Sequence, residues 1–143
     1  MKIAIASDHG GFELKEQLIR FLETEGIEVS DLGTYSCESV DYPMFGRSCA
    51  LKVAEGHADR GIVVCGTGIG ISIAANKVKG IRCALCTSTE MAELTRRHND
   101  ANMLALGGRT TDVETAVQIA KVWLETEFEG GRHQRRVDML NEM

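Results

Sequence analysis

Strand-like and helix-like segments alternate along the whole chain, and this alternation constrains the fold more than any other feature. Apolar, β-branched runs cover residues 2–7, 27–32, 62–64, 81–86 and 102–106, while segments with helical periodicity cover 11–25, 43–56, 69–78, 89–97 and 112–125. Strands that alternate with helices form a parallel sheet with helices on both faces. The sequence therefore predicts an α/β fold, a three-layer αβα sandwich around a five-stranded parallel sheet of Rossmann-like type with strand order 2-1-3-4-5.

Length and charge narrow the classes of function. The 143 residues fit a single domain, 1–143, that is large enough to bury a core. With 16 Lys and Arg against 21 Asp and Glu, the net charge of −5 predicts no nucleic-acid partner. No apolar stretch approaches the ~20 residues of a membrane span, and the chain starts with a short strand rather than a leader. We expect a cytoplasmic protein with no membrane partner.

The five cysteines form no disulfide framework and are expected to be reduced. Cys83 and Cys86 spell C-x-x-C, but both lie in one predicted strand, where residues three apart point to opposite faces. Packing in the core is therefore a better interpretation than a redox pair. No second Cys or His pair stands at zinc-ligand spacing, so no metal is predicted.

An apolar strand runs directly into a cysteine and a glycine-rich turn at Cys65-Gly66-Thr67-Gly68-Ile69-Gly70. The glycines allow a sharp turn whose N–H groups can approach a bound oxygen, and the following helix adds partial positive charge. A thiol in this field should ionise more easily than a free cysteine, so Cys65 is interpreted as a base or a nucleophile. The alternative is a small buried hydrophobic residue, the usual role of a free cysteine.

Two other groups follow predicted strands, at the edge of the sheet where α/β proteins bind ligands. Asp8-His9-Gly10-Gly11 follows the first strand and Gly107-Gly108-Arg109 the fifth. For Asp8 two interpretations stay open, a cap of the next helix or a ligand-binding carboxylate.

The fourth helix and the tail carry further candidates. His98-Asn99-Asp100 ends that helix, where a histidine either compensates the helix dipole or donates a proton to a sugar oxygen. Arg132 and Arg136 are four residues apart and share a helical face, which suits either a solvated basic surface or a phosphate clamp. The segment 130–143 either folds back on its own domain or reaches a second subunit.

Three common motifs do not fit this chain. The glycines at 66, 68 and 70 do not follow G-x-G-x-x-G, and no acidic residue ends the next strand to hold a ribose, which argues against a dinucleotide site. No phosphate-binding G-x-x-x-x-G-K-[ST] occurs. Ile71 stands where a cysteine phosphatase needs an arginine.

Taken together, the motifs closely resemble those of ribose-5-phosphate isomerase type B, nearly from end to end. Five pieces occur in order and at suitable spacing: Ser7-Asp8-His9-Gly10-Gly11, Asp41-Tyr42-Pro43, Cys65 to Gly70, Arg97-His98-Asn99-Asp100 and Gly130-Gly131-Arg132-His133-Gln134-Arg135-Arg136. The resemblance implies a five-stranded parallel sandwich that forms a homodimer or homotetramer with sites between subunits. The tail 130–143 would then pack on a partner subunit.

The resemblance also implies roles for single residues. Cys65 would accept the proton at C2 of the opened aldose, His98 would help to open the furanose ring, and Thr67 would assist the proton shuttle. The amides of the glycine-rich turn would stabilise the enediolate as an oxyanion hole. Substrate-binding residues implied in the same way are Asp8, His9, Tyr42, Gly66, Gly68, Ile69, Gly70, Asn99, Arg109, Arg132 and Arg136. One branch of the family carries a glutamate in place of Ile71 and lacks the cysteine, so this chain belongs to the cysteine branch.

The predicted function is therefore the interconversion of ribose 5-phosphate and ribulose 5-phosphate, with a phosphorylated aldose or ketose as substrate and no cofactor or metal. Two alternatives stay open. One is an isomerase for allose 6-phosphate or galactose 6-phosphate, because related enzymes share the scaffold. The other is a non-catalytic sensor of sugar phosphates, which would keep the arginines and glycines without needing an activated thiol.

Overall fold

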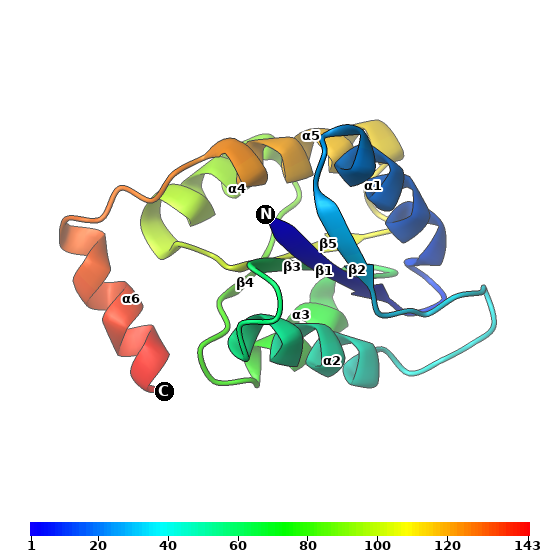
Figure 1. Ribbon diagram of the computed structural model, residues 1–143, viewed down its shortest axis with the longest axis horizontal. Helices are drawn as coiled ribbons and strands as arrows, with labels where there is room; N and C mark the ends of the chain where they lie inside the picture. Colours follow the sequence, from blue (N-terminus) through cyan, green and yellow to red (C-terminus); the bar gives the residue numbers. More distant parts are fainter.

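The computed structural model describes residues 1–143 (Figure 1). Its strands are β1 (Lys2–Ser7), β2 (Glu28–Asp31), β3 (Arg60–Cys65), β4 (Cys83–Leu85) and β5 (Met103–Gly107). Its helices are α1 (Phe12–Thr24), α2 (Tyr42–Ala54), α3 (Ile69–Asn76), α4 (Thr89–Leu94), the π-helix η1 (Thr95–Asn99), α5 (Val113–Glu125) and α6 (Arg132–Glu142). None of these helices is long and apolar enough to cross a membrane.

The predicted three-layer parallel α/β fold is confirmed. All strand pairs are parallel, with α1, α4 and α5 on one face of the sheet and α2 and α3 on the other (Figure 1). Residues alternate along β3, so that Ile62 and Val64 join the core under α1 and α5 while Val63 and Cys65 join the core under α2 and α3. The two faces also separate the C-x-x-C cysteines, because Cys86 packs in the first core and Cys83 against the second. This confirms their interpretation as packing residues.

The predicted order of the last two strands is wrong. The sheet runs β2-β1-β3-β5-β4, so β5 lies between β3 and β4. The reason is burial: all five residues of β5 are buried, as an interior parallel strand requires, whereas the three residues of β4 are only half-buried and suit an edge. The correction matters for function, because it pairs Cys65 with Gly107 and brings the turn after β5 beside the cysteine.

The helix predicted over 89–97 is an α-helix only in its first part and a π-helix after that. Ser88 caps α4 by accepting the N–H of Met91, but the α-helix ends at Leu94 and the chain continues as η1. Single π-turns of this kind occur frequently at functional sites.

The tail forms a helix, α6, that packs on η1 (Figure 1). Its buried side chains are His133 and Val137, while Met139, Leu140 and Met143 are exposed. Within one copy of the chain, α6 therefore folds back on its own domain and still presents an apolar surface outward.

Candidate active site

Cys65 ends β3 at the carboxyl edge of the sheet and is 5% exposed. Its Sγ accepts a hydrogen bond from the backbone N–H of Gly68 at 3.2 Å. Gly68 has φ of +79°, and a Cβ there would lie 2.7 Å from Cδ1 of Leu85 and 2.8 Å from the carbonyl carbon of Leu106. Only glycine satisfies both conditions, so this residue fixes the turn that holds the sulfur.

The turn after Cys65 presents free amides. The backbone N–H groups of Gly66, Thr67 and Gly70 donate to no acceptor within the chain, because they lie at or before the first turn of α3. The positive end of the helix dipole is at the same place. The arrangement can hold a negatively charged oxygen close to the Cys65 sulfur.

Thr67 and Ile69 lie on the outer side of this turn. The Oγ1 of Thr67 accepts the N–H of Ile69 at 3.2 Å, and both residues are exposed. Tyr42, the first residue of α2, packs against Gly70 so closely that a Cβ on the glycine would lie 2.5 Å from Cζ of the tyrosine ring. This contact places Tyr42, one of the predicted substrate-binding residues, beside the turn.

The turns after β1 and β5 close around the cysteine turn. The N–H of Gly108 donates to the carbonyl of Cys65 at 2.8 Å, and the N–H of Arg109 donates to the carbonyl of Gly66 at 2.9 Å. The Arg109 side chain is exposed and crosses beside Gly10 and Gly66, with Cζ 3.4 Å from the position of a Cβ on Gly10. The three turns after β1, β3 and β5 are thus brought together, as the topology of the sheet predicts.

Asp8 and His9 combine local and outward roles. One carboxylate oxygen of Asp8, Oδ1, accepts the N–H of Gly11 at 3.1 Å, so the capping interpretation holds for that oxygen, while Oδ2 makes no hydrogen bond within the chain. The Nδ1 of His9 accepts the N–H of Val40 at 3.1 Å. In the neutral imidazole the proton is then on Nε2, which is left as a donor.

The other predicted site residues lie near the amino ends of β3 and β5, whereas Cys65 lies at the carboxyl end of β3. His98 and Asn99 end η1 just before β5 begins, and Met103 at that beginning pairs with Gly61 at the beginning of β3. A strand of five residues is about 17 Å long, so one copy of the chain does not bring His98 to Cys65. Arg132 and Arg136 of α6 are on the same side as His98, exposed and without an acidic partner.

The His98 ring stacks on a histidine that sequence reasoning did not assign a role. The rings of His98 and His133 are 4.3 Å apart and inclined by 16°, and Glu129 lies beside both. Partial desolvation and the nearby charge of His98 lower the pKa of His133. Desolvation raises the pKa of Glu129, but the hydrogen bond and charge of Arg97 outweigh it and leave that pKa below its usual range.

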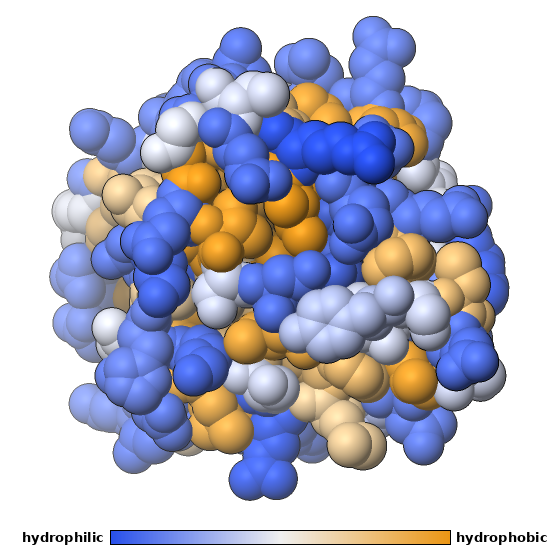
Figure 2. Space-filling model, turned by 45° about the vertical axis from the view of Figure 1, so that its right-hand side comes forward, coloured by the Kyte–Doolittle hydropathy of each residue, from blue (hydrophilic) through white to orange (hydrophobic).

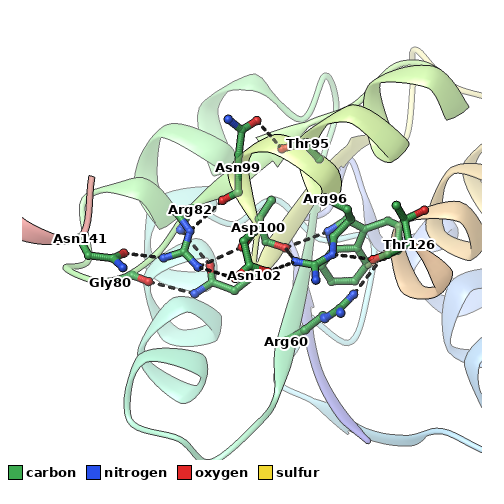
Figure 3. A network of polar contacts seen from close by, with 12 residues as sticks. Arg60, Gly80, Arg82, Thr95, Arg96, Asn99, Asp100, Asn102, Thr126 and Asn141 are labelled. Carbon is green, nitrogen blue, oxygen red and sulfur yellow. Dashed lines mark hydrogen bonds and ion pairs between the residues drawn. The ribbon is translucent and has the colours of Figure 1, made fainter. Parts of the chain in front are cut away.

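A polar network holds the end of η1 in place (Figure 3). The Arg82 guanidinium donates to the carbonyls of Asn99 and Asp100, each at 3.0 Å, and to the side chain of Asn141 on α6. Arg96, buried, donates to the Asp100 carboxylate at 2.7 Å. Asp100 has φ of +47°, a left-handed conformation that ends η1 and turns the chain toward β5.

Arg82 was not expected to have a functional role, because it lies in a predicted strand and no local pattern marks it. Burial is the main cause that lowers the pKa of its guanidinium, with Asp100 opposing. A cavity of about 620 Å³ opens beside it, between η1, the α3–β4 turn and the end of α6. This cavity lies near the amino end of β5, away from Cys65, and is lined in part by Asn99 and Leu140.

Comparison with known proteins decides the family. The family model described as Ribose/Galactose Isomerase matches residues 3–140, nearly the whole chain. The chain belongs to the ribose/galactose isomerase family. This isomerase is 50% identical over 139 residues to ribose-5-phosphate isomerase B of Escherichia coli (strain K12), a match that covers 97% of this chain and 93% of that protein.

Solved relatives share the whole fold of this isomerase. The ribose-5-phosphate isomerase B of Clostridium thermocellum superposes with a TM-score of 0.98 at 56% identity, covering 99% of this chain and 96% of the other. The ribose-5-phosphate isomerase B of Mycoplasma genitalium, solved with bound ribulose-5-phosphate, gives a TM-score of 0.95 at 43% identity and covers 99% and 94% of the two chains. The resemblance inferred from the five motifs is confirmed.

Proposed function

We propose that the chain interconverts ribose 5-phosphate and ribulose 5-phosphate through an enediolate, with Cys65 as the base. The observation that carries this proposal is the position of the Cys65 sulfur at the mouth of the turn whose Gly66, Thr67 and Gly70 amides are free. A base and an oxyanion hole side by side are what proton abstraction next to a carbonyl requires. Relatives named ribose-5-phosphate isomerase B, one of them solved with ribulose-5-phosphate, support the choice of substrate.

The reaction moves one proton between neighbouring carbons. The thiolate of Cys65 takes the proton from C2 of the open aldose, and the electron pair moves to the carbonyl oxygen at C1 to give the enediolate. The free amides of the turn hold the negative oxygen. The proton then returns to C1. Thr67, an exposed residue of the turn after Cys65, passes a second proton from the oxygen on C2 to the oxygen on C1.

The remaining groups bind or open the sugar. Asp8 and Asn99 contact the sugar hydroxyls, and His9, Arg109, Arg132 and Arg136 contact the phosphate. His98 donates the proton that opens the furanose ring. The sugar chain lies along Gly66, Gly68, Ile69 and Gly70 and is bounded by Tyr42. Neither a metal nor an organic cofactor has a role in these steps.

A second copy of the chain supplies part of each site in this proposal. Cys65 and His98 lie at opposite edges of one sheet, so they meet only if the carboxyl edge of one subunit faces α6 and η1 of another. Residues 1–143 then act as one domain whose tail, 130–143, packs on the partner of a homodimer or homotetramer. Exposed apolar side chains suit such a contact, among them Ile69 (52% exposed), Ile73 (56%) and Met139 (56%). The face in Figure 2 shows hydrophobic surface gathered in patches between hydrophilic side chains.

Subunit mixing tests this arrangement. The variants Cys65→Ala and His98→Ala should each be inactive alone, and refolding them together in equal amounts should restore about a quarter of the wild-type activity, because half the dimers carry one intact site. Mixtures that stay inactive, from subunits shown to exchange, would contradict shared sites.

Direct assay tests the reaction itself. We expect ribulose 5-phosphate to form from ribose 5-phosphate in the presence of chelator, with kcat/KM higher than for allose 6-phosphate or galactose 6-phosphate. Preference for a six-carbon substrate would assign the alternative isomerase. Binding of all three without turnover would indicate a sensor. The five free cysteines are consistent with a reducing compartment, and we place the enzyme in the cytoplasm.

A further inference from the structure

Three side chains from separate segments converge beside η1. His98 ends η1, Glu129 lies in the connection between α5 and α6, and His133 is in the first turn of α6. One potential ligand atom from each lies within 4.8 Å of the others. The Nε2 of His133 is 3.7 Å from Oε1 of Glu129, and the Nε2 of His98 is 3.9 Å from Oε2.

The cluster is held by contacts outside the three side chains. The N–H of Glu129 donates to the carbonyl of Arg97 at 3.1 Å, and the Nε of Arg97 donates to Oε2 of Glu129 at 2.6 Å. The second carboxylate oxygen, Oε1, is thereby turned toward His133. Outer contacts of this kind orient the ligands in metal sites and strengthen binding.

Two imidazoles and one carboxylate form a recognised ligand set for zinc, with a fourth position left for water or another ligand. Ligands at about 2.1 Å from a tetrahedral ion are about 3.4 Å apart. The three ligand atoms, one from each residue, lie within 4.8 Å of one another, so they need to approach by up to about 1.4 Å, and the stacked histidine rings need to turn toward the ion. Side-chain exposure of 37% for His98 and 38% for Glu129 gives an ion access from solvent. Imidazole ligands favour zinc, copper and nickel over magnesium and calcium.

We propose that His98, Glu129 and His133 form a binding site for a divalent ion of the zinc type, and that the bound ion inhibits the enzyme by occupying the His98 imidazole. A metal on the ring nitrogen takes the lone pair that would otherwise carry the proton to the sugar oxygen. Ring opening then stops, although Cys65 and its amides are untouched. The inhibition rests on the proposed function of His98, whereas the binding does not.

Cobalt is the probe for binding, because tetrahedral Co²⁺ absorbs in the visible range and replaces zinc in such sites. Titration of the full chain should give one visible-absorbing site per chain that zinc displaces. The variants His133→Ala and Glu129→Gln should each weaken binding at least about tenfold. The matched control is His57→Ala, which removes the exposed histidine 3.7 Å from Glu55, a pair without a third ligand, and should bind as wild type does.

Two results would overturn the site. One is unchanged affinity in both His133→Ala and Glu129→Gln, with folding verified by circular dichroism. The other is a sulfur-to-cobalt charge-transfer band, which would assign the ion to a cysteine.

Inhibition is measured on ribose 5-phosphate turnover, each variant relative to its own metal-free rate. Zinc at saturating concentration should reduce wild-type turnover at least tenfold and chelator should restore it, while His133→Ala should need at least tenfold more zinc. Zinc that binds at the cluster and leaves turnover unchanged would overturn the inhibitory role. If metal-free wild type has no isomerase activity, the proposed function fails, and the cobalt titration still decides the site.

Discussion

The backbone N–H of Gly68 points at the Sγ of Cys65 and donates a hydrogen bond to it at 3.2 Å. The bond holds the sulfur at the carboxyl end of β3, beside the free amides of the same turn. One short segment, Cys65 to Gly70, therefore determines both where the sulfur lies and which backbone N–H groups surround it. Because three of its residues are glycines, the segment can approach a substrate without side chains in the way.

Cys65→Ala should lower kcat for ribose 5-phosphate by about a thousandfold or more and change KM little, because the base acts only in the proton-transfer step. Steady-state kinetics checks this. The matched control is Cys37→Ala, which removes an exposed thiol outside the site and should leave both constants unchanged. Near-normal turnover of the Cys65 variant would remove the thiol from the mechanism.

Alkylation should distinguish three cysteines whose thiols are desolvated from Cys65, whose sulfur accepts the Gly68 N–H at the end of β3. Burial raises the pKa of Cys49 and of Cys86 to about 12, and it holds the pKa of Cys83 well above the usual range. Since a raised thiol pKa means the neutral form at pH 8, iodoacetamide should spare these three in the folded protein and modify Cys37 and Cys65. Peptide mass spectrometry should show that substrate protects Cys65 alone. Equal labelling of Cys65 with and without substrate would be the contrary result.

The sequence predicts the layers of the fold, and the strand ends at which candidate residues stand, because these depend on local patterns. Alternating strand and helix periods define a parallel sandwich, and the residues after β1, β3 and β5 meet because parallel strands end at one edge. The order of β4 and β5 depends on which strand is buried on both faces. A run such as Ile81 to Cys86 is apolar enough to suggest an interior strand, but only three of its residues pair.

Other features depend on contacts between distant segments. The stacking of His98 on His133 joins residues 35 apart in sequence, and it exists only because α6 folds back on η1. The end of η1 is likewise held by distant segments, because Arg82 donates to the carbonyl of Asp100, and Arg96 of η1 itself donates to the carbonyl of Thr126. No local sequence pattern predicts the stacking of the two histidines or the π-turn. Cys65 and His98 are separated within one chain because they lie at opposite ends of the parallel strands β3 and β5. Only the resemblance to a known family assigns both residues to one site.

Gly68→Ala should destabilise the fold and abolish most activity. A Cβ at this position meets Leu85 and the Leu106 backbone below 3 Å, and the left-handed φ adds strain of its own. We expect a loss of about 3 kcal/mol or more in the free energy of unfolding. Gly26→Ala is the matched control, with φ of +75° and nothing within 4 Å of the added Cβ, so its cost should be only about 1 kcal/mol.

Urea denaturation of the two variants measures the difference. Similar losses for Gly68→Ala and Gly26→Ala would mean that the turn yields to the added methyl group, and that close packing against Leu106 does not fix its geometry.

Arg82→Met should impair catalysis because Arg82 holds His98 in position, and not because Arg82 contacts the substrate. The guanidinium ties the carbonyls of Asn99 and Asp100 to Asn141 on α6, so its loss frees the end of η1 that carries His98. Losing charged hydrogen bonds at a half-buried site should cost about 1–3 kcal/mol of stability. We also expect kcat to fall about tenfold, because a catalytic group displaced by an ångström loses much of its effect.

Hydrogen exchange distinguishes this positioning role from general destabilisation. Amides of 95–101 should exchange faster in Arg82→Met, while those of β2, the edge strand on the other side of the sheet from β4, should change only as much as global stability does. Arg20→Met, which removes an exposed arginine of α1 that has no ion-pair partner, should leave exchange and kcat unchanged. A uniform increase in exchange, or a kcat equal to that of the wild type, would show that Arg82 stabilises the fold without positioning η1.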